Sequence, residues 1–161
     1  MIFKNQILVI DTNVAIVANG NSDHVSIDCQ IACADLIEQC AKLNIALDYD
    51  GMMMTEYRKH LSHAGQPGQG DAFFKYLHDN QHAHKKVKRY TITPVDDGRG
   101  FDELPDNELD PSDHKFLATA VVAKAMIINA TDSDWDENIN LLEQLNINVH
   151  QLCPEHCRRT N

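Results

Sequence analysis

The sequence predicts an α/β fold built on a parallel sheet, and two observations carry this prediction. Short apolar runs of strand length recur along the chain and alternate with segments whose apolar residues follow helical spacing. The chain of 161 residues is also long enough for one domain around a single hydrophobic core. We expect that domain to span residues 1–152 and residues 153–161 to form a C-terminal tail.

The first expected strand is the apolar run QILVI at residues 6–10, which is typical of a strand buried on both faces. Asp11 follows it directly, where the chain is expected to turn. Apolar residues at helical spacing then predict a helix over residues 26–43. IALDY, residues 45–49, is the second expected strand.

The middle of the chain is predicted to be less regular. Residues 52–61 favour a helix, and the glycine and proline content of residues 63–70 indicates a flexible loop. Asp71 is suited to cap a further helix. The β-branched residues of 85–95 predict an edge strand or an extended arm, and residues 96–110 form an acidic loop.

The clearest local pattern opens the next helix. Asp110 is the expected N-cap, Pro111 occupies the first helical position and Asp113 lies in the first turn. The remaining expected elements are a strand over residues 125–129, a helix over residues 136–145 and a strand over residues 147–152.

Four acidic residues are expected to converge at one edge of this sheet. In α/β folds the active site lies beyond the carboxyl ends of the strands. Asp11 follows the first strand, Asp132 follows the strand at 125–129, and Asp113 begins the helix that leads into that strand. Glu56 lies on the helix after the second strand. Each acid taken singly has an ordinary role as a cap, a turn residue or an exposed helix residue, so the hypothesis rests on their joint placement.

Clustered carboxylates point to a divalent cation. Side by side they repel one another, which raises their pKa values, and a bound cation removes that penalty. Mg²⁺ takes oxygen ligands, keeps several waters and bridges to substrate phosphates. One or two such ions can activate water and stabilise the leaving oxygen in phosphodiester hydrolysis.

The charge distribution is uneven. The formal net charge is −10, but the segment from Arg58 to Tyr90 has seven Lys or Arg against two Asp or Glu, a net charge of +5. One basic face on an acidic body suits a protein that grips phosphates; the alternative is a solvated helix face with a charged loop. The candidate nucleic-acid-binding residues are Arg58, Lys59, Lys85, Lys86, Lys88 and Arg89.

Three segments resemble those of PIN-domain ribonucleases: ILVIDTNV (7–14), DPSDHKFLATAVVAKA (110–125) and IINATDSDW (127–135). A fourth, DGMMMTEYRKHL (50–61), matches by position and by its apolar residues. The resemblance implies a three-layer α/β/α sandwich with a mainly parallel sheet. It also implies cleavage of RNA, less often DNA, that depends on Mg²⁺ or Mn²⁺.

The resemblance assigns roles to residues and suggests partners. Asp11, Glu56, Asp113 and Asp132 would hold metal and orient the attacking water, with Asp134 as an auxiliary acid. Asn13 or Thr131 would support the site through hydrogen bonds. Many small members of the family are toxins paired with an antitoxin, others act in RNA processing or defence, and a homodimer is expected only from this likeness.

The cysteines and the N-terminus favour a cytoplasmic protein without a membrane span. Five cysteines without framework spacing argue against a secreted disulfide scaffold. Cys29 and Cys33, one helical turn apart, are expected in the core. The group His150, Cys153, His156 and Cys157 contains zinc ligands, but its spacing fits no standard zinc motif, and an ordinary tail is expected.

Two further side chains lie next to the predicted acids in sequence, and two other functions are alternatives to a nuclease. Trp135 is expected to be buried beside the site, and His114 to be an exposed helix residue. A PIN-like module that binds RNA or protein without cutting is the main alternative to a nuclease. A phosphohydrolase acting on small esters with an aspartate nucleophile is disfavoured, because the residue two positions after Asp11 is Asn13.

Overall fold

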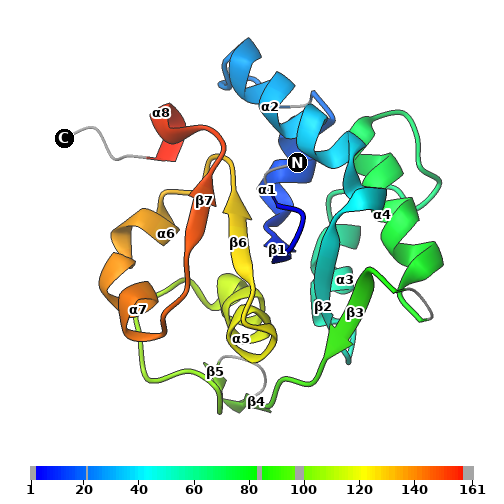
Figure 1. Cartoon of the computed structure of the whole chain (residues 1–161). Coiled ribbons are helices and arrows are strands. Elements are labelled where there is room, and N and C mark those ends of the chain that lie inside the picture. Colours follow the sequence, from blue (N-terminus) through cyan, green and yellow to red (C-terminus); the bar gives the residue numbers. More distant parts are fainter. Residues whose placement is uncertain (1–2, 21, 83–84, 97–99, 158–161) are drawn as a thin grey trace.

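The computed structural model describes residues 3–20, 22–82, 85–96 and 100–157 (Figure 1). Residues 158–161 of the expected tail and residues 97–99 of the acidic loop lie outside the described residues. The described chain is an α/β structure around one five-stranded, all-parallel sheet. The predicted fold class is therefore confirmed.

The central sheet has the strand order β3-β2-β1-β6-β7. Its strands are β1 (Ile7–Ile10), β2 (Asn44–Asp48), β3 (Val87–Tyr90), β6 (Met126–Asn129) and β7 (Val149–Gln151). A separate antiparallel pair joins β4 (Pro94–Val95) to β5 (Gly100–Phe101) within the segment predicted as arm and loop.

The middle strand of the sheet is the most buried one. Leu8, Val9 and Ile10 of β1 have no solvent exposure. In the register, Leu8 faces Met126 and Ile10 faces Ile128 across the β1–β6 pair. A strand covered on both faces needs apolar residues at successive positions, which explains the uninterrupted apolar run in the sequence.

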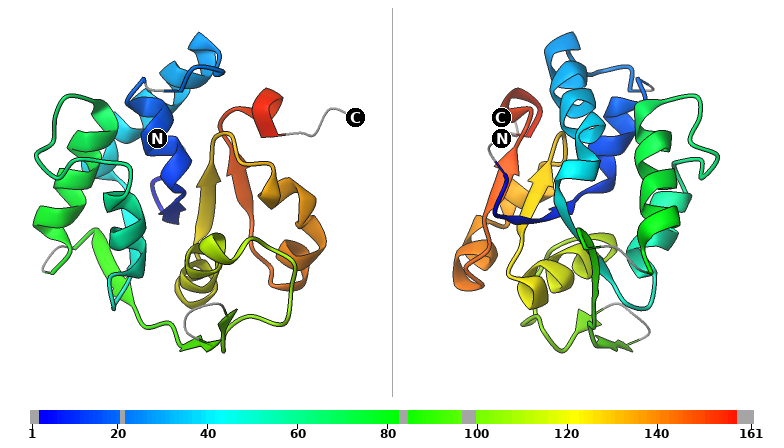
Figure 2. Two further views of the ribbon diagram at one scale, coloured as in Figure 1. Left: turned by 180° about the vertical axis from the view of Figure 1, so that it is seen from behind. Right: turned by 45° about the vertical axis from the view of Figure 1, so that its right-hand side comes forward.

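Helices flank the central sheet, as expected for a three-layer α/β/α sandwich. Residues of α1, α2 and α4 pack on one another, whereas α5 packs against β1 and β2 (Figures 1 and 2). The helices are α1 (Thr12–Ala18), α2 (Ile27–Glu38), α3 (Met52–Arg58), α4 (Gln69–Asn80), α5 (His114–Ala123), α6 (Asp134–Glu137), α7 (Ile139–Gln144) and α8 (Pro154–Cys157). Single 3-10 turns occupy Cys40–Lys42 and Pro111–Asp113.

Glycines in the predicted flexible loop have a packing role. A Cβ on Gly70 would lie 2.0 Å from the Ala15 carbonyl oxygen, so helices α1 and α4 approach closely only because this position is glycine. Asp71 is not the N-cap of α4 but its third residue, since the helix begins at Gln69. Its buried carboxylate accepts hydrogen bonds from the backbone N–H groups of Ser62 and Gly68.

The chain stays packed beyond the expected domain end at residue 152. Cys153 and Cys157 are buried, and Cys153 forms a disulfide with Cys29. This disulfide departs from the expectation drawn from cysteine spacing, because its partners are 124 residues apart and only the fold brings them together.

Among the described residues, no helix combines the length and the apolar character needed to cross a lipid bilayer.

Candidate metal centre

The candidate site lies where the sheet changes direction. From β1 the chain passes to β2 and β3 on one side, whereas β6 and β7 lie on the other side. Ligand sites of open parallel sheets form at such a switch point, beyond the carboxyl ends of the strands. Asp11 directly follows β1, and its backbone N–H donates to the Ile128 carbonyl of β6 at 3.0 Å.

Three of the four predicted acids meet at this point. Asp11, Asp113 and Asp132 each offer a carboxylate oxygen, and these oxygens lie within 4.8 Å of one another. Asp113 ends the 3-10 turn that leads into α5, and Asp132 follows β6 by three residues. Asp11 and Asp113 are buried, and Asp132 is half-buried. Such a group of oxygens could hold one divalent cation.

Without a bound cation, the pKa values of all three clustered aspartates are raised above the ordinary value for Asp. Burial, followed by the charges of Asp11 and Asp132, raises the pKa of Asp113 to about 8. Burial also raises the pKa of Asp11 to about 6, although the Trp135 indole works in the opposite direction. The pKa of Asp132 is raised, again mainly by burial.

Trp135 is buried beside the site, as expected. Its exposed fraction is 0%, and its Nε1–H donates to Asp11 Oδ2 at 2.6 Å. A hydrogen bond to an ionised oxygen orients that carboxylate and stabilises its charged form. Trp135 therefore fixes the direction in which Asp11 presents its oxygens.

An asparagine that was not predicted from the sequence, Asn129, fixes the loop after β6. Asn129 is fully buried; its Nδ2 donates to the Asp132 carbonyl at 2.8 Å, and its Oδ1 accepts from the Asp132 backbone N–H at 3.2 Å. Asn13 donates to the same Oδ1 at 2.9 Å and accepts from the backbone N–H of Ala130 at 2.8 Å. Hydrogen bonding by Asn13 was predicted. An amide at the last position of an otherwise apolar strand was the signal for Asn129.

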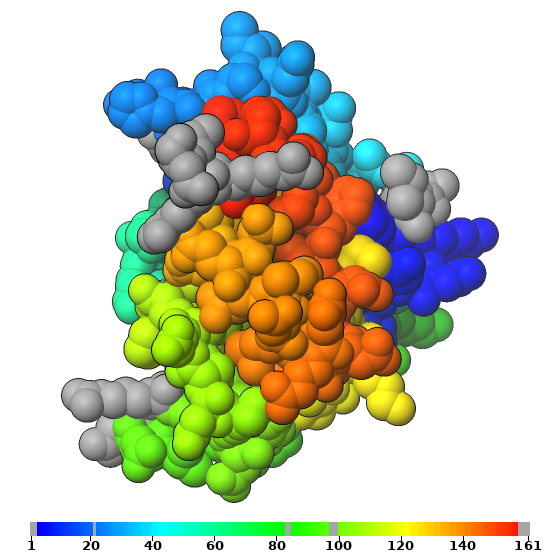
Figure 3. Space-filling view, turned by 90° about the vertical axis from the view of Figure 1, so that its left-hand side faces the viewer, coloured from blue at the N-terminus to red at the C-terminus, as the bar shows by residue number. Residues whose placement is uncertain are grey.

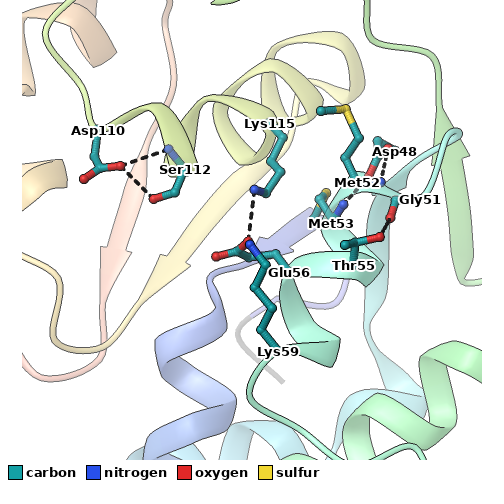
Figure 4. Close-up of polar contacts among 10 residues, drawn as sticks. All are labelled: Asp48, Gly51, Met52, Met53, Thr55, Glu56, Lys59, Asp110, Ser112 and Lys115. Carbon is teal, nitrogen blue, oxygen red and sulfur yellow. Dashed lines mark hydrogen bonds and ion pairs between the residues drawn. The ribbon is translucent and has the colours of Figure 1, made fainter. Parts of the chain in front are cut away.

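Glu56 stands apart from the three aspartates. Its Oε2 accepts from Lys59 at 2.9 Å and from Lys115 at 3.2 Å, as the converging side chains in Figure 4 show. Burial works to raise the pKa of Glu56, but the two lysines outweigh it, and the net shift is downward. Lys115, whose side chain is only 14% exposed, was not singled out from the sequence. Its position two residues after Asp113 was the available signal.

Two further acids have local roles. Asp110 caps the 3-10 turn, since its Oδ1 accepts from the backbone N–H of Ser112 at 2.9 Å, as predicted (Figure 4). The backbone N–H of Asp134 donates to Asp132 Oδ1 at 2.9 Å, so residue 134 positions its neighbour through the main chain. The Asp134 carboxylate does not belong to the group of three whose oxygens lie within 4.8 Å of one another.

The expectation for His114 was wrong. This histidine is buried, and its Nε2 lies 2.8 Å from the Leu109 carbonyl oxygen. The contact ties α5 to the preceding loop. The alternation of polar and apolar residues at the start of the helix did not reveal this contact, because the covering loop comes from outside the helix.

The candidate nucleic-acid-binding residues are distributed over two elements. Arg58 ends α3 with its guanidinium 5.9 Å from the centre of the Phe74 ring, and Lys59 follows it. The other four residues, Lys85, Lys86, Lys88 and Arg89, belong to or precede the edge strand β3. Arg89 stacks over Tyr49 at 4.4 Å, whereas Lys85, Lys86 and Lys88 are exposed.

Comparisons with known proteins add no assignment. No protein-family model, curated protein or solved structure matches the chain.

Proposed function

We propose that the protein is a metal-dependent nuclease, most specifically an endoribonuclease of the PIN type. One observation supports this more than any other: Asp11, Asp113 and Asp132 come from three separate places in the sequence, yet their oxygens lie within 4.8 Å at the switch point of the sheet. Perturbed acids gathered at such a place are typical of functional sites.

The donor set fits Mg²⁺ or Mn²⁺. All three ligand candidates are carboxylates, the oxygen donors that these hard cations prefer. Raised pKa values at Asp11 and Asp113 are also what carboxylates without a counter-charge should have. When bound, such a cation would supply an activated water and charge stabilisation at the scissile phosphate.

The surrounding residues prepare the site rather than react. Trp135 orients Asp11 through its hydrogen bond, and Asn129 holds the backbone that carries Asp132. Glu56 remains ionised beside Lys115, so the fourth acid adds little net charge to the cluster. In this proposal Glu56 is an outer acid that does not ligate the cation directly, and Asp134 supports Asp132.

Substrate binding is assigned to the basic residues of α3 and β3. Exposed lysines along an edge strand can follow a phosphate backbone, and their contribution falls as salt rises. Charge reversal of Lys85, Lys86 and Lys88 should weaken RNA binding and flatten its salt dependence; unchanged binding would remove these residues from the interface. An antitoxin partner, a role in processing or defence, and a homodimer remain predictions from the resemblance.

A cleavage assay tests the proposal. Wild type, Asp11→Asn and the exposed-surface control Asp35→Asn are incubated with single-stranded RNA or DNA in Mg²⁺, Mn²⁺ or EDTA. We expect cleavage of RNA by wild type and by Asp35→Asn, and none by Asp11→Asn or in EDTA.

No cleavage of any substrate, with no heat of Mg²⁺ or Mn²⁺ binding by calorimetry, would contradict the nuclease assignment. The separation of Glu56 from the three aspartates favours the second candidate in that case, a PIN-like module that binds RNA or protein without cutting.

A further inference from the structure

A group of cysteines lies apart from the carboxylate cluster. The Sγ atoms of Cys29, Cys33 and Cys153 are all within 4.8 Å of one another. Cys29 and Cys33 are one turn apart on α2, and Cys157 lies four residues after Cys153, at the end of α8. All four are buried. The fold thus turns two pairs of cysteines, distant in sequence, toward one another.

Polar contacts hold α8 on α2 independently of the disulfide. The Ser26 backbone N–H donates to His156 Nε2 at 3.2 Å, and Ser26 Oγ donates to Glu155 Oε1 at 3.3 Å. Figure 3 shows α8, in red, seated directly against the blue segment that contains α2. The sulfur atoms are therefore expected to stay close together after reduction of the Cys29–Cys153 bond.

A disulfide uses only two of these sulfurs. Cys33 is a third buried sulfur within reach of both. Cys157 is outside this 4.8 Å group, but its Sγ donates to the Cys153 carbonyl oxygen at 3.3 Å, which places it one helical turn from a member of the group. Burial, followed by the charge of Cys157, raises the pKa of the Cys33 thiol to about 12. Tetrahedral zinc with bonds of about 2.3 Å to sulfur requires sulfur atoms roughly 3.8 Å apart. Since Cys29, Cys33 and Cys153 already lie within 4.8 Å of one another, small side-chain movements after reduction of the disulfide would allow that spacing.

We propose that the reduced protein binds one Zn²⁺ ion through the sulfurs of Cys29, Cys33, Cys153 and Cys157. This site is distinct from the carboxylate cluster: its ligands are soft thiolates rather than hard oxygens, and it has no open position for catalysis. Cys157 gives up its hydrogen bond to the Ala130 carbonyl when it ligates the metal. The role of the zinc is to fasten α8 to α2 under reducing conditions, where the disulfide is absent.

The chemistry balances with an external dithiol as reductant. The dithiol transfers two electrons and two protons to the Cys29–Cys153 bond, which yields two protein thiols and one cyclic disulfide of the reductant. Binding of Zn²⁺ to four thiols then releases up to four protons and forms four Zn–S bonds. No other redox partner is required.

Cobalt substitution distinguishes this site from the carboxylates. Co²⁺ replaces zinc in tetrahedral thiolate sites and gives a sulfur-to-cobalt charge-transfer band, which oxygen ligands do not give. The reduced full-length protein is titrated with Co²⁺ and then with Zn²⁺. We expect a charge-transfer band that saturates at one equivalent, disappears when Zn²⁺ is added and is absent from the oxidised protein.

Two variants and one matched control complete the test. Cys33→Ser leaves the disulfide intact, so folding can be checked by circular dichroism in the oxidised state, and we expect loss of the saturating band after reduction. Cys157→Ser should also change the band. Cys40→Ser alters a cysteine outside the group and should leave the band unchanged. Absence of the band from the reduced wild type, or an unchanged band in either Cys33→Ser or Cys157→Ser, would overturn the four-sulfur proposal.

Discussion

The indole of Trp135 donates its N–H to a carboxylate oxygen of Asp11 at 2.6 Å, and both side chains are buried. This bond joins the residue after the first strand to a short helix that follows the fourth strand of the central sheet in chain order, α6. Through it, an aromatic side chain orients one of the three clustered acids.

Replacing Trp135 by Phe should remove this donor. A hydrogen bond to a charged group contributes about 1.5–3 kcal/mol, so the free energy of unfolding should fall by about that amount at pH 8, where Asp11 is ionised. At pH 5 the loss should be smaller, because Asp11 is then largely protonated. Cleavage should fall at least roughly tenfold, as for other residues that orient metal ligands. Urea unfolding at the two pH values is the measurement; equal losses would show that Trp135 acts only by packing.

The carboxylate cluster predicts the pH dependence of stability. The pKa values of Asp113 and Asp11 in the folded protein, about 8 and about 6, exceed the ordinary value of about 3.9 in an unfolded chain. The folded state therefore binds these protons more tightly. The stability that this proton binding adds to the folded state is fully present below about pH 4. It is lost as pH rises through about 6 for Asp11 and about 8 for Asp113.

Metal-free protein should thus unfold at a lower temperature at pH 8 than at pH 5, and millimolar Mg²⁺ should restore stability at pH 8 only. Asp113→Asn should stabilise the metal-free protein at pH 8 by on the order of 2 kcal/mol. The exposed-surface variant Asp35→Asn is the matched control for calorimetry. Stability that rises with pH in the metal-free wild type would contradict the raised pKa values.

Lys115 and Lys59 contact the same oxygen of Glu56 but differ in exposure, 14% against 61% for their side chains. Exposed ion pairs contribute little to the stability of the folded protein. Removing one partner of a shielded pair leaves an uncompensated charge, which destabilises the fold. Lys115→Met should therefore lower the free energy of unfolding by about 1–3 kcal/mol, and Lys59→Met by less than about 0.5 kcal/mol. Denaturant titration of both variants provides the comparison, and equal effects would count against the special position of Lys115.

Asn129 connects the end of β6 to the loop that carries Asp132. Asn129→Ala removes a side chain that both donates to and accepts from Asp132 and leaves the Asn13 amide without its acceptor. Loss of this buried hydrogen-bond network should lower the free energy of unfolding by about 3 kcal/mol. Cleavage should fall as well, because the loop that carries Asp132 is no longer held in place. Asn138→Ala, which removes a single donor to the Asp134 carbonyl, is the matched control and should cost about 1 kcal/mol.

Much of the fold followed from periodicity. Apolar runs predicted β1, β2 and β6, β-branched residues predicted an edge strand or arm where β3 lies, and the Asp110-Pro111 pair marked the start of the turn that leads into α5. The packing role of Gly70 was not predicted, because composition does not distinguish a flexible loop from a close approach of two helices. The same limit applies to Cys29 and Cys153, whose pairing depends on where two distant helices lie.

The sequence predicted three members of the acidic cluster from their positions after strands and at a helix start. It did not predict that Glu56 would be drawn toward two lysines, because Lys115 reaches it across 59 residues. Asn129 and Lys115 were overlooked for the same reason: their importance lies in contacts between segments, and a residue type alone does not show them.

The order of strands in the sheet has a consequence for synthesis of the chain on the ribosome. β1 lies in the middle of the sheet and is made before the other strands of that sheet, but its neighbour β6 begins only at Met126. Until that segment is made, one edge of β1 has no partner and Asp11 stands without Asp132. A nascent or prematurely terminated chain that stops before Asp132 would therefore lack the assembled acids, so any metal binding that depends on all three would begin only after that residue had been translated.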